Sequence, residues 1–141
     1  MKTQIISHQF DINPVPAARP RVSRFSTYYP KKYTRFKKEM EALTGELDTT
    51  PCESLVVVSL RFKIKIPQSW SKKKRLEREN TYCNNNSDID NYIKAMLDSL
   101  NGVYFIDDRQ VVEVFASKKY SNEPRILFTM MEMNNDEGRT M

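Results

Sequence analysis

Five aspartates lie close together in one short stretch of this chain, between Ser87 and Gln110. They are Asp88, Asp90, Asp98, Asp107 and Asp108, and the cation Lys94 stands among them. The chain as a whole is basic, with a formal net charge of +5 at pH 7. A local reversal of charge in a basic protein is typical of a divalent-metal site that faces an anionic substrate.

Three of these carboxylates, Asp88, Asp90 and Asp108, are candidates for a single metal site. The first two stand at the start of an expected helix, and Asp108 stands in an expected turn between two strands. If that hairpin packs against the N-terminus of the helix, the three carboxylates converge on one point. Hard oxygen ligands suit Mg²⁺, which takes few protein carboxylates and leaves room for water and substrate phosphate. The metal would lower the pKa of a bound water and offset charge in the transition state of phosphodiester hydrolysis.

Lys94 follows Asp90 by four positions, so both side chains point along the same flank of the helix. A lysine beside a metal site can neutralise a phosphate or orient the attacking water. Asp88, Asp90, Asp108 and Lys94 therefore form a reasonable catalytic set for a phosphodiesterase.

The start of the helix also has a structural interpretation. Ser87 or Asp88 can cap the helix, because an oxygen acceptor there satisfies free backbone donors and acid suits the helix dipole. Asp90 and Lys94 can form an ordinary i, i+4 pair that stabilises the helix by about 0.2 to 0.5 kcal/mol. On spacing alone, this pair is the stronger interpretation of those two residues.

The remaining acids have structural interpretations too. Asp107 and Asp108 together are a normal turn composition, and Asp107 is at most an accessory residue of the site. Asp98 fits a solvated helix face, being more than two turns from Asp88. His8, the only histidine, lies in an expected strand, where we expect a structural role.

Hydrophobic periodicity predicts the elements that must position these residues. We expect strands at residues 4–12, 54–66, 103–106, 111–120 and 125–133, and helices at residues 30–47, 71–79 and 88–100. Residues 103–106 and 111–120 would be the two arms of the hairpin around Asp108. The prolines between Pro14 and Pro30 exclude a helix from that segment, because proline fixes φ and restricts the residue before it.

Cations gather in two segments of the chain. Between Pro14 and Lys38 there are Arg19, Arg21, Arg24, Lys31, Lys32, Arg35, Lys37 and Lys38 with no acid, and a second run holds Lys72, Lys73, Lys74, Arg75 and Arg78. Met singly, such runs are more often solvated faces than binding sites. Together they form a basic footprint, and we expect Arg19, Arg21, Arg24, Lys31, Lys32, Lys72, Lys73 and Lys74 to contact a phosphate backbone.

Length and composition exclude several classes of protein. The 141 residues suit one domain with its own core. Cys52 and Cys83 lack metal-ligand or redox spacing, which favours reduced thiols. No apolar run approaches the roughly 20 residues of a membrane span, and the N-terminus lacks the apolar region of a signal peptide. We therefore expect a cytoplasmic protein with no membrane partner and no small-molecule cofactor.

The acidic stretch resembles a known family once its motifs are taken together. Residues 87–94 (SDIDNYIK), 97–103 (LDSLNGV) and 107–111 (DDRQV) resemble the DLDN-x-x-K, LDALNG and DDxQV signatures of the RusA family of Holliday junction endodeoxyribonucleases. Upstream, residues 16–21 (PAARPR), 29–32 (YPKK) and 66–74 (IPQSWSKKK) are similar to further segments of that family. The resemblance covers roughly residues 12–120, in order.

The resemblance implies an α+β fold: a single RusA-like nuclease domain over residues 1–133, with a mixed β-sheet, two main helices packed on it, and a polar tail at 134–141. It implies a magnesium-dependent homodimer, with Mn²⁺ able to substitute, of bacterial or prophage origin. Asp88, Asp90 and Asp108 match the metal-binding aspartates of the family, and Lys94 matches its essential lysine. One departure is Ser87, where the family usually has proline.

The leading hypothesis is therefore metal-assisted resolution of four-way junctions in DNA recombination and repair. Paired cuts in two strands related by a twofold axis require two equivalent sites, which an isologous dimer supplies. Two alternatives remain open at this stage. One is a non-catalytic protein that binds branched DNA, and the other is a nuclease that acts on forks, flaps or RNA.

Overall fold

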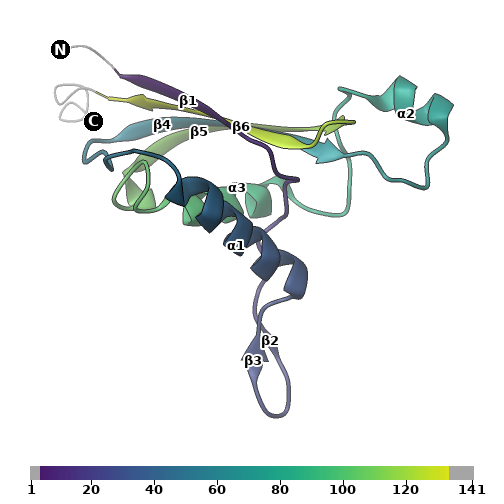
Figure 1. Ribbon diagram of the computed structural model, residues 1–141, viewed down its shortest axis with the longest axis horizontal. Coiled ribbons are helices and arrows are strands. Elements are labelled where there is room, and N and C mark those ends of the chain that lie inside the picture. The colour runs from purple at the N-terminus through teal and green to yellow at the C-terminus, as the bar shows by residue number, and fades with distance from the viewer. Residues whose placement is uncertain (1–3, 134–141) are drawn as a thin grey trace.

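The computed structural model describes residues 4–133 of the chain, which form a four-stranded mixed sheet with helices on one side (Figure 1). The strand order is β1-β6-β4-β5. The strands are β1 (Ile5–Phe10), β4 (Val56–Lys65), β5 (Val111–Ser121) and β6 (Arg125–Glu132). β6 pairs antiparallel with both β1 and β4, whereas β4 and β5 are parallel. The predicted α+β fold is confirmed.

Strand β4 shows why the sheet has one covered face and one open face. Its residues alternate between buried and less buried positions, so Val56, Val58, Leu60 and Phe62 lie in the core. The residues between them, including Arg61, point to the opposite face. This alternation fixes the register, because a slip of one residue would bury the cations.

Two helices cover the apolar face of the sheet. Helix α1 (Lys31–Gly45) begins after Pro30, a residue with no backbone N–H to leave unsatisfied, and buries Tyr33, Phe36 and Met40. Helix α3 (Ile89–Leu100) buries Tyr92, Ala95, Met96 and Leu100. Both predicted helices are confirmed, as is the short helix α2 (Lys72–Arg78), whose N-cap Ser71 accepts a hydrogen bond from the Lys74 backbone N–H at 3.2 Å.

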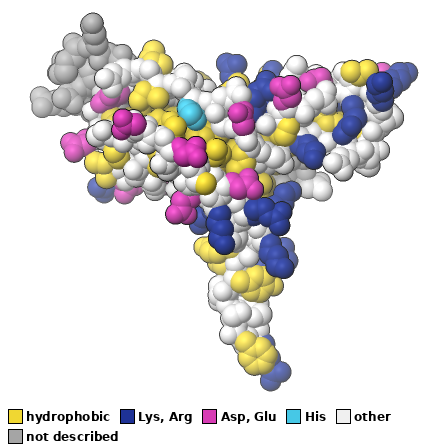
Figure 2. All heavy atoms as spheres, viewed as in Figure 1, with side chains coloured by type: hydrophobic (Ala, Val, Ile, Leu, Met, Phe, Trp, Pro, Cys, Tyr) yellow, Lys and Arg dark blue, Asp and Glu magenta, His cyan; other side chains and the backbone are white. Residues whose placement is uncertain are grey.

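The proline-rich segment is an arm, defined here as residues 18–30, that projects away from the sheet and helices (Figures 1 and 2). It is not helical, as predicted, but it contains a hairpin that the sequence pattern did not predict. Strand β2 (Arg21–Val22) pairs antiparallel with β3 (Thr27–Tyr28).

The predicted hairpin around Asp108 is wrong. Residues 103–106 are turn and bridge, not strand, and Gly102 turns the chain with φ of +78°. Residues Asp108–Gln110 form a short 3₁₀ helix, η1. The physical reason is that β5 pairs in parallel with β4, and a parallel pair needs a crossover. Helix α3 provides that crossover, so the turn with Asp108 follows the C-terminal end of α3.

Several smaller features complete the described chain. Cys52 and Cys83 are both free thiols. No helix within residues 4–133 is long and apolar enough to cross a lipid bilayer. The expected tail at 134–141 lies outside the described residues.

Candidate metal and phosphate site

The first turn of α3 presents two carboxylates that no structural task occupies. Asp88 is the N-cap residue, with extended backbone angles, yet its side chain makes no capping hydrogen bond. Asp90 follows in the first turn, and both residues are exposed. The ion pairs within residues 4–133 are Arg109–Asp107 and Arg125–Glu123. The structural interpretations of Asp88 as a side-chain cap and of Asp90 as a partner of Lys94 are thus not supported.

The start of α3 is held in place from the sheet by Lys118 of β5. Its Nζ donates hydrogen bonds to the Ser87 backbone carbonyl at 2.6 Å and to Asn85 Oδ1 at 2.8 Å. Asn85 in turn donates to the Tyr92 hydroxyl at 2.8 Å. These contacts hold the loop before Asp88 in place. They also bring the Lys118 ammonium to the backbone of Ser87, the residue before Asp88.

Lys94 lies in a cationic groove between α3, α1 and the root of the arm. The groove has a volume of about 310 Å³, and its lining includes Arg19, Lys37, Lys94 and Asp98. Three cations and one acid give it a net positive charge, which suits a phosphate group. The Ala17 backbone N–H donates to the Asn91 carbonyl at 2.8 Å, so the arm root is fixed to α3.

The structure therefore brings together two predicted residues, Lys94 and Arg19, from segments 75 positions apart in the sequence. It adds Lys37 and Tyr29, which the sequence reasoning did not assign to the site. The Lys37 ammonium lies 5.3 Å from the centre of the Tyr29 ring. The signal that could have found Lys37 was its spacing of four residues from Tyr33, which places it at the border of the buried stripe of α1.

A second groove shares Ala18 and Tyr33 with the first. Its volume is about 420 Å³, and its lining includes Arg21, Lys32, Lys65 and Ser87. Positive charge thus flanks the start of α3 on two sides, and Ser87 connects this groove to Asp88.

The acids at the other end of α3 are arranged differently. Asp107 caps η1, accepting a hydrogen bond from the Arg109 backbone N–H at 3.0 Å, and this contact is the main reason that its pKa is lowered. The pKa of Asp108 is raised, first by its side-chain hydrogen bond with Asp107, then by burial and by the negative charges of Asp107 and Asp98. The turn with Asp108 is tied to the C-terminal end of α3, because the Tyr104 N–H donates to the Leu100 carbonyl at 3.2 Å, the Cys52 N–H donates to the Tyr104 carbonyl at 2.9 Å, and Gln110 Nε2 donates to the Cys52 carbonyl at 2.7 Å.

The expected convergence of Asp88, Asp90 and Asp108 within one chain is wrong. At a rise of 1.5 Å per residue, Asp90 and Asp98 are about 12 Å apart along the helix axis, and the turn with Asp108 is bonded at the C-terminal end of the helix. Within residues 4–133, no three His, Cys, Asp or Glu side chains are grouped closely enough to hold a metal ion. A pair of carboxylates with open positions still fits Mg²⁺, which commonly binds one or two of them plus water and phosphate oxygens.

The remaining predicted DNA contacts are exposed cations in two regions. Arg19, Arg21 and Arg24 lie on the arm, and Lys31 and Lys32 lie in the first turn of α1, directly after the arm. Lys72, Lys73 and Lys74 lie in α2. Figure 2 shows blue side chains along the arm and over α2, while most of the acidic groups lie on the body of the molecule.

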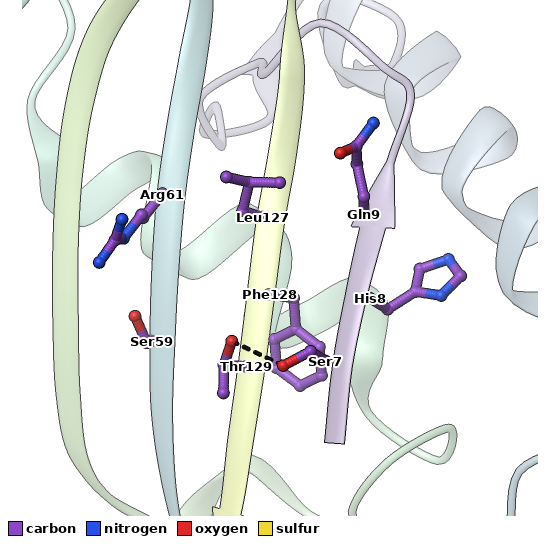
Figure 3. A pocket seen from close by; sticks show the side chains of 8 residues that line it. All are labelled: Ser7, His8, Gln9, Ser59, Arg61, Leu127, Phe128 and Thr129. Carbon is purple, nitrogen blue, oxygen red and sulfur yellow. Dashed lines mark hydrogen bonds between the residues drawn. The ribbon is translucent and has the colours of Figure 1, made fainter. Parts of the chain in front are cut away.

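The uncovered face of the sheet has its own basic cluster. The pKa of Lys63 is lowered by burial and by the nearby charges of Lys119, Arg125 and Arg61. A hollow of about 540 Å³ lies on this face, with Ser7, Gln9, Arg61 and Thr129 among its lining (Figure 3). None of the five aspartates lines it.

His8 is turned away from the side chains that point into the hollow (Figure 3). It packs instead against Phe10, with 4.4 Å between ring centres. This packing agrees with the structural role expected for the only histidine.

Comparison with known proteins adds two findings. The family model described as Endodeoxyribonuclease RusA matches residues 11–131. The chain is also 30% identical over 130 residues to a Bacillus subtilis (strain 168) protein named Uncharacterized protein YqaN, covering 86% of this chain and 92% of that protein.

Proposed function

This chain belongs to the RusA family of endodeoxyribonucleases, and from that premise we propose that it resolves four-way DNA junctions by paired hydrolysis of phosphodiester bonds. The observation that carries this proposal is the cationic groove around Lys94, which adjoins two exposed carboxylates on the first turn of the same helix. Acid for a metal and cations for a phosphate thus lie within about one helical turn of each other.

Each residue of the site receives a role in this proposal. Asp88 and Asp90 bind a divalent cation, Mg²⁺ or Mn²⁺, which when bound would acidify a water and neutralise developing negative charge. Lys94, with Arg19 and Lys37, holds the scissile phosphate through charge-assisted hydrogen bonds. Holding the phosphate in one orientation supplies part of the rate enhancement, because the reacting groups no longer have to find each other.

Because Asp108 is separated from Asp88 and Asp90 within one chain, a second subunit would have to supply Asp108 to the same site. Resolution needs two equivalent sites related by a twofold axis, and an isologous homodimer provides them. We assign to the homodimer a composite site, in which Asp108 of one subunit joins Asp88 and Asp90 of the other. This arrangement would supply the third carboxylate that a single chain does not place there.

The outer edge of β5 is the proposed contact between the subunits. β5 ends the strand order, and its first half exposes Val112, Val114 and Phe115, which are 41%, 38% and 63% exposed, with the exposed Glu113 among them. Only its far end is covered, where residues 80–83 bond to the backbone of Lys118 and Tyr120. A long apolar edge with unpaired backbone groups is a template for pairing with another strand.

The register of such pairing would deliver Asp108 to the right place. Suppose that β5 of one subunit pairs antiparallel with β5 of the other, with the twofold axis at Val114. A residue a given number of positions before Val114 then lies opposite the partner residue the same number of positions after it. Gln110 then falls opposite the partner's Lys118, where residues 80–83 already cover the edge, so backbone pairing would be limited to residues 111–117. In each subunit Lys118 holds the Ser87 carbonyl at 2.6 Å, so the turn with Asp108 would reach the start of the partner's α3.

A non-catalytic protein that binds branched DNA is the second candidate. The observation that favours it is the absence, within residues 4–133 of one chain, of a group of three metal ligands. The basic grooves and the arm would serve such a protein equally well, because phosphate contacts position DNA without requiring chemistry.

One assay separates the candidates. The purified protein is incubated with a four-way junction, a fork and a linear duplex, each with magnesium or with a chelator. We expect symmetric paired nicks in the junction with magnesium, no nicks with chelator, and none with Asp90→Asn. Asp11→Asn, which removes an exposed aspartate of the loop after β1, is the matched control and should cut normally.

Three other results would count against junction resolution. Tight junction binding without cleavage under any divalent ion would favour the binding protein. Dominant cutting of the fork would favour a fork or flap nuclease. Cutting that persists in chelator would remove the metal from the proposal.

A further inference from the structure

The arm ends in a short, closed turn that displays one aromatic side chain. The Ser23 N–H donates to the Ser26 carbonyl at 2.7 Å, and the Ser26 N–H donates to Ser23 Oγ at 3.1 Å. The Ser23 hydroxyl also donates to the Ser26 carbonyl at 3.0 Å. These bonds close the turn, so Arg24 and Phe25, the two residues between Ser23 and Ser26, form the tip of the hairpin. The arm that carries this hairpin projects from the body of the molecule (Figure 2).

Phe25 is 89% exposed, the highest fraction among the large apolar side chains of the described residues. The Arg24 guanidinium lies 5.6 Å from the centre of its ring. Val22, Tyr28 and Tyr29 on the same arm are also exposed. Single exposed apolar residues are normal, but an apolar group gathered on a projecting element marks a contact surface.

The chemistry of the arm indicates what it contacts. It carries Arg19, Arg21 and Arg24, and no acid occurs between Pro14 and Lys38. Aromatic rings interleaved with arginines are the groups on which unstacked nucleobases stack, with cation–π support from arginine. Phenylalanine is also one of the side chains that proteins insert between base steps.

The dimensions of the arm suit insertion more than groove contact. From Ala18 to Phe25 the chain advances seven residues, a reach of about 20 Å at the rise of an extended strand. The major groove of DNA is about 8.5 Å deep. An arm of this reach can therefore extend past the phosphates to the base stack, and a branch point is where the stack is interrupted.

We propose that Phe25 stacks on a nucleobase exposed at the branch point, so that the arm recognises interrupted base stacking rather than sequence. The inference rests on the proposed function for its substrate, branched DNA, but assigns a binding site that the catalytic residues do not include. The bond between Ala17 and Asn91 at 2.8 Å fixes the arm root to α3. A base held at the tip thereby positions the adjoining backbone relative to the groove around Lys94.

The experiment measures binding without cleavage, in chelator, to a four-way junction that carries 2-aminopurine beside the branch point. We expect the wild-type protein to change the fluorescence of this base. Phe25→Ala should abolish that change and weaken junction binding by about 5-fold to 150-fold, the range of base–aromatic stacking. Its affinity for uninterrupted duplex should stay unchanged.

Two further variants separate stacking from other effects. Phe25→Tyr keeps the ring and should retain the signal, whereas Phe25→Leu keeps apolar bulk and should lose it. Ile5→Ala is the matched control, because it removes a side chain that is 66% exposed on β1, outside the arm. It should behave as wild type.

Several results would overturn the inference: unchanged junction affinity in Phe25→Ala, full activity of Phe25→Leu in the fluorescence assay, or an equal loss of affinity for duplex. Binding of the wild-type arm to anionic lipid vesicles in preference to the junction would assign it to a membrane instead. Because the assay needs no cleavage, its failure is distinct from failure of the nuclease proposal. If the wild-type protein did not cleave the junction at all, the fluorescence change caused by stacking could still be measured.

Discussion

The two ends of α3 carry the same kind of side chain in opposite surroundings. At the N-terminal end, Asp88 and Asp90 have cations nearby, including Lys118 behind the preceding loop. At the C-terminal end, the pKa of Asp108 is raised by its side-chain hydrogen bond with Asp107, by burial and by the charges of Asp107 and Asp98, although Asp98 itself also lines the groove with Lys94. The first end resembles a site that is balanced in charge. The second carries an excess of negative charge that a cation could relieve.

The two neighbouring aspartates at this end of α3 differ in what they do for the fold. Asp107 has a clear structural task, because it caps η1. Asp108 has none that is visible and stands beside two other acids. Adjacent acids that lower the stability of the fold, with no packing contact to offset the loss, are typical of functional positions. The comparison therefore groups Asp108 with Asp88 and Asp90 in function, although the fold of one chain keeps them apart.

The largest expected effect comes from Asp90→Asn at the N-terminal end. We expect junction cleavage to fall by more than about 100-fold, beyond the effect of losing a residue that merely supports a metal ligand. Folding should be intact, because Asp90 is exposed and makes no ion pair within residues 4–133. Single-turnover cleavage and thermal melting measure the two quantities.

Asp98→Asn is the matched variant on the same helix. We expect its loss of cleavage to stay below about 10-fold, since it removes a charge near the groove but no proposed ligand. Equal losses in the two variants would erase the distinction between the ends of α3. Unfolding of Asp90→Asn would indicate a structural role for that residue.

Mixing two inactive variants tests whether the two ends meet across the subunit interface. If the site is composite, Asp90→Asn and Asp108→Asn are each inactive, but a hybrid dimer contains one intact site. Equal mixing should restore roughly a quarter of the wild-type sites, since half of the dimers are hybrids with one good site each. The product should be single nicks rather than paired cuts.

Recovery should depend on the edge of β5. In Val114→Lys, a charge replaces an apolar edge residue and should oppose pairing, so sedimentation should show a monomer and mixing should restore nothing. No recovery with intact dimers would place Asp108 outside the site. A dimeric Val114→Lys protein would move the interface elsewhere.

A smaller effect is expected from Lys37→Met in the groove around Lys94. Lys37 lines that groove with Arg19, so its loss should weaken junction binding across all sequences and reduce the slope of log K against log salt by about 1. Titration at several salt concentrations measures this slope. Lys38→Met, on the neighbouring exposed position of α1, is the control that should leave the slope unchanged.

The sequence predicted the helices and most of the strands better than the way they are arranged around the candidate site. The apolar stripe of α3 and the alternation of β4 identified both elements, because these patterns are local. Residues 103–106 looked like a strand because Val103, Tyr104, Phe105 and Ile106 are apolar or aromatic. In the fold, Tyr104 and Phe105 are buried in a turn, so tertiary packing and not strand pairing explains them.

The rest of the site depended on information that is not local. Whether β5 pairs in parallel or antiparallel decides which end of α3 receives Asp108, and no residue pattern near Asp108 states that choice. The groove that joins Arg19, Lys37 and Lys94 depends on how α1 packs against α3. The serines that close the arm were visible in the sequence, but the exposure of Phe25 became clear only once the arm was seen to project.

The smallest expected effect concerns stability and compares Asp108 with its neighbour. The pKa of Asp108 is raised in the folded protein, so its contribution to stability is present at acid pH and is lost as the pH rises through its folded pKa. Asp108→Asn should therefore raise the melting temperature slightly at pH 7 and have no effect near pH 3. Thermal melts in chelator at both pH values measure this.

Asp107 should show the opposite sign. Its pKa is lowered, chiefly by the hydrogen bond from the Arg109 N–H, so its stabilisation is present at neutral pH and is lost as the pH falls through the folded pKa. Asp107→Ala should lower the melting temperature at pH 7, with the difference shrinking in acid. If both variants shifted the melting temperature in the same direction at pH 7, the repulsion between Asp107 and Asp108 would not be what distinguishes them. The excess negative charge at this end of α3 would then need another explanation than a missing cation.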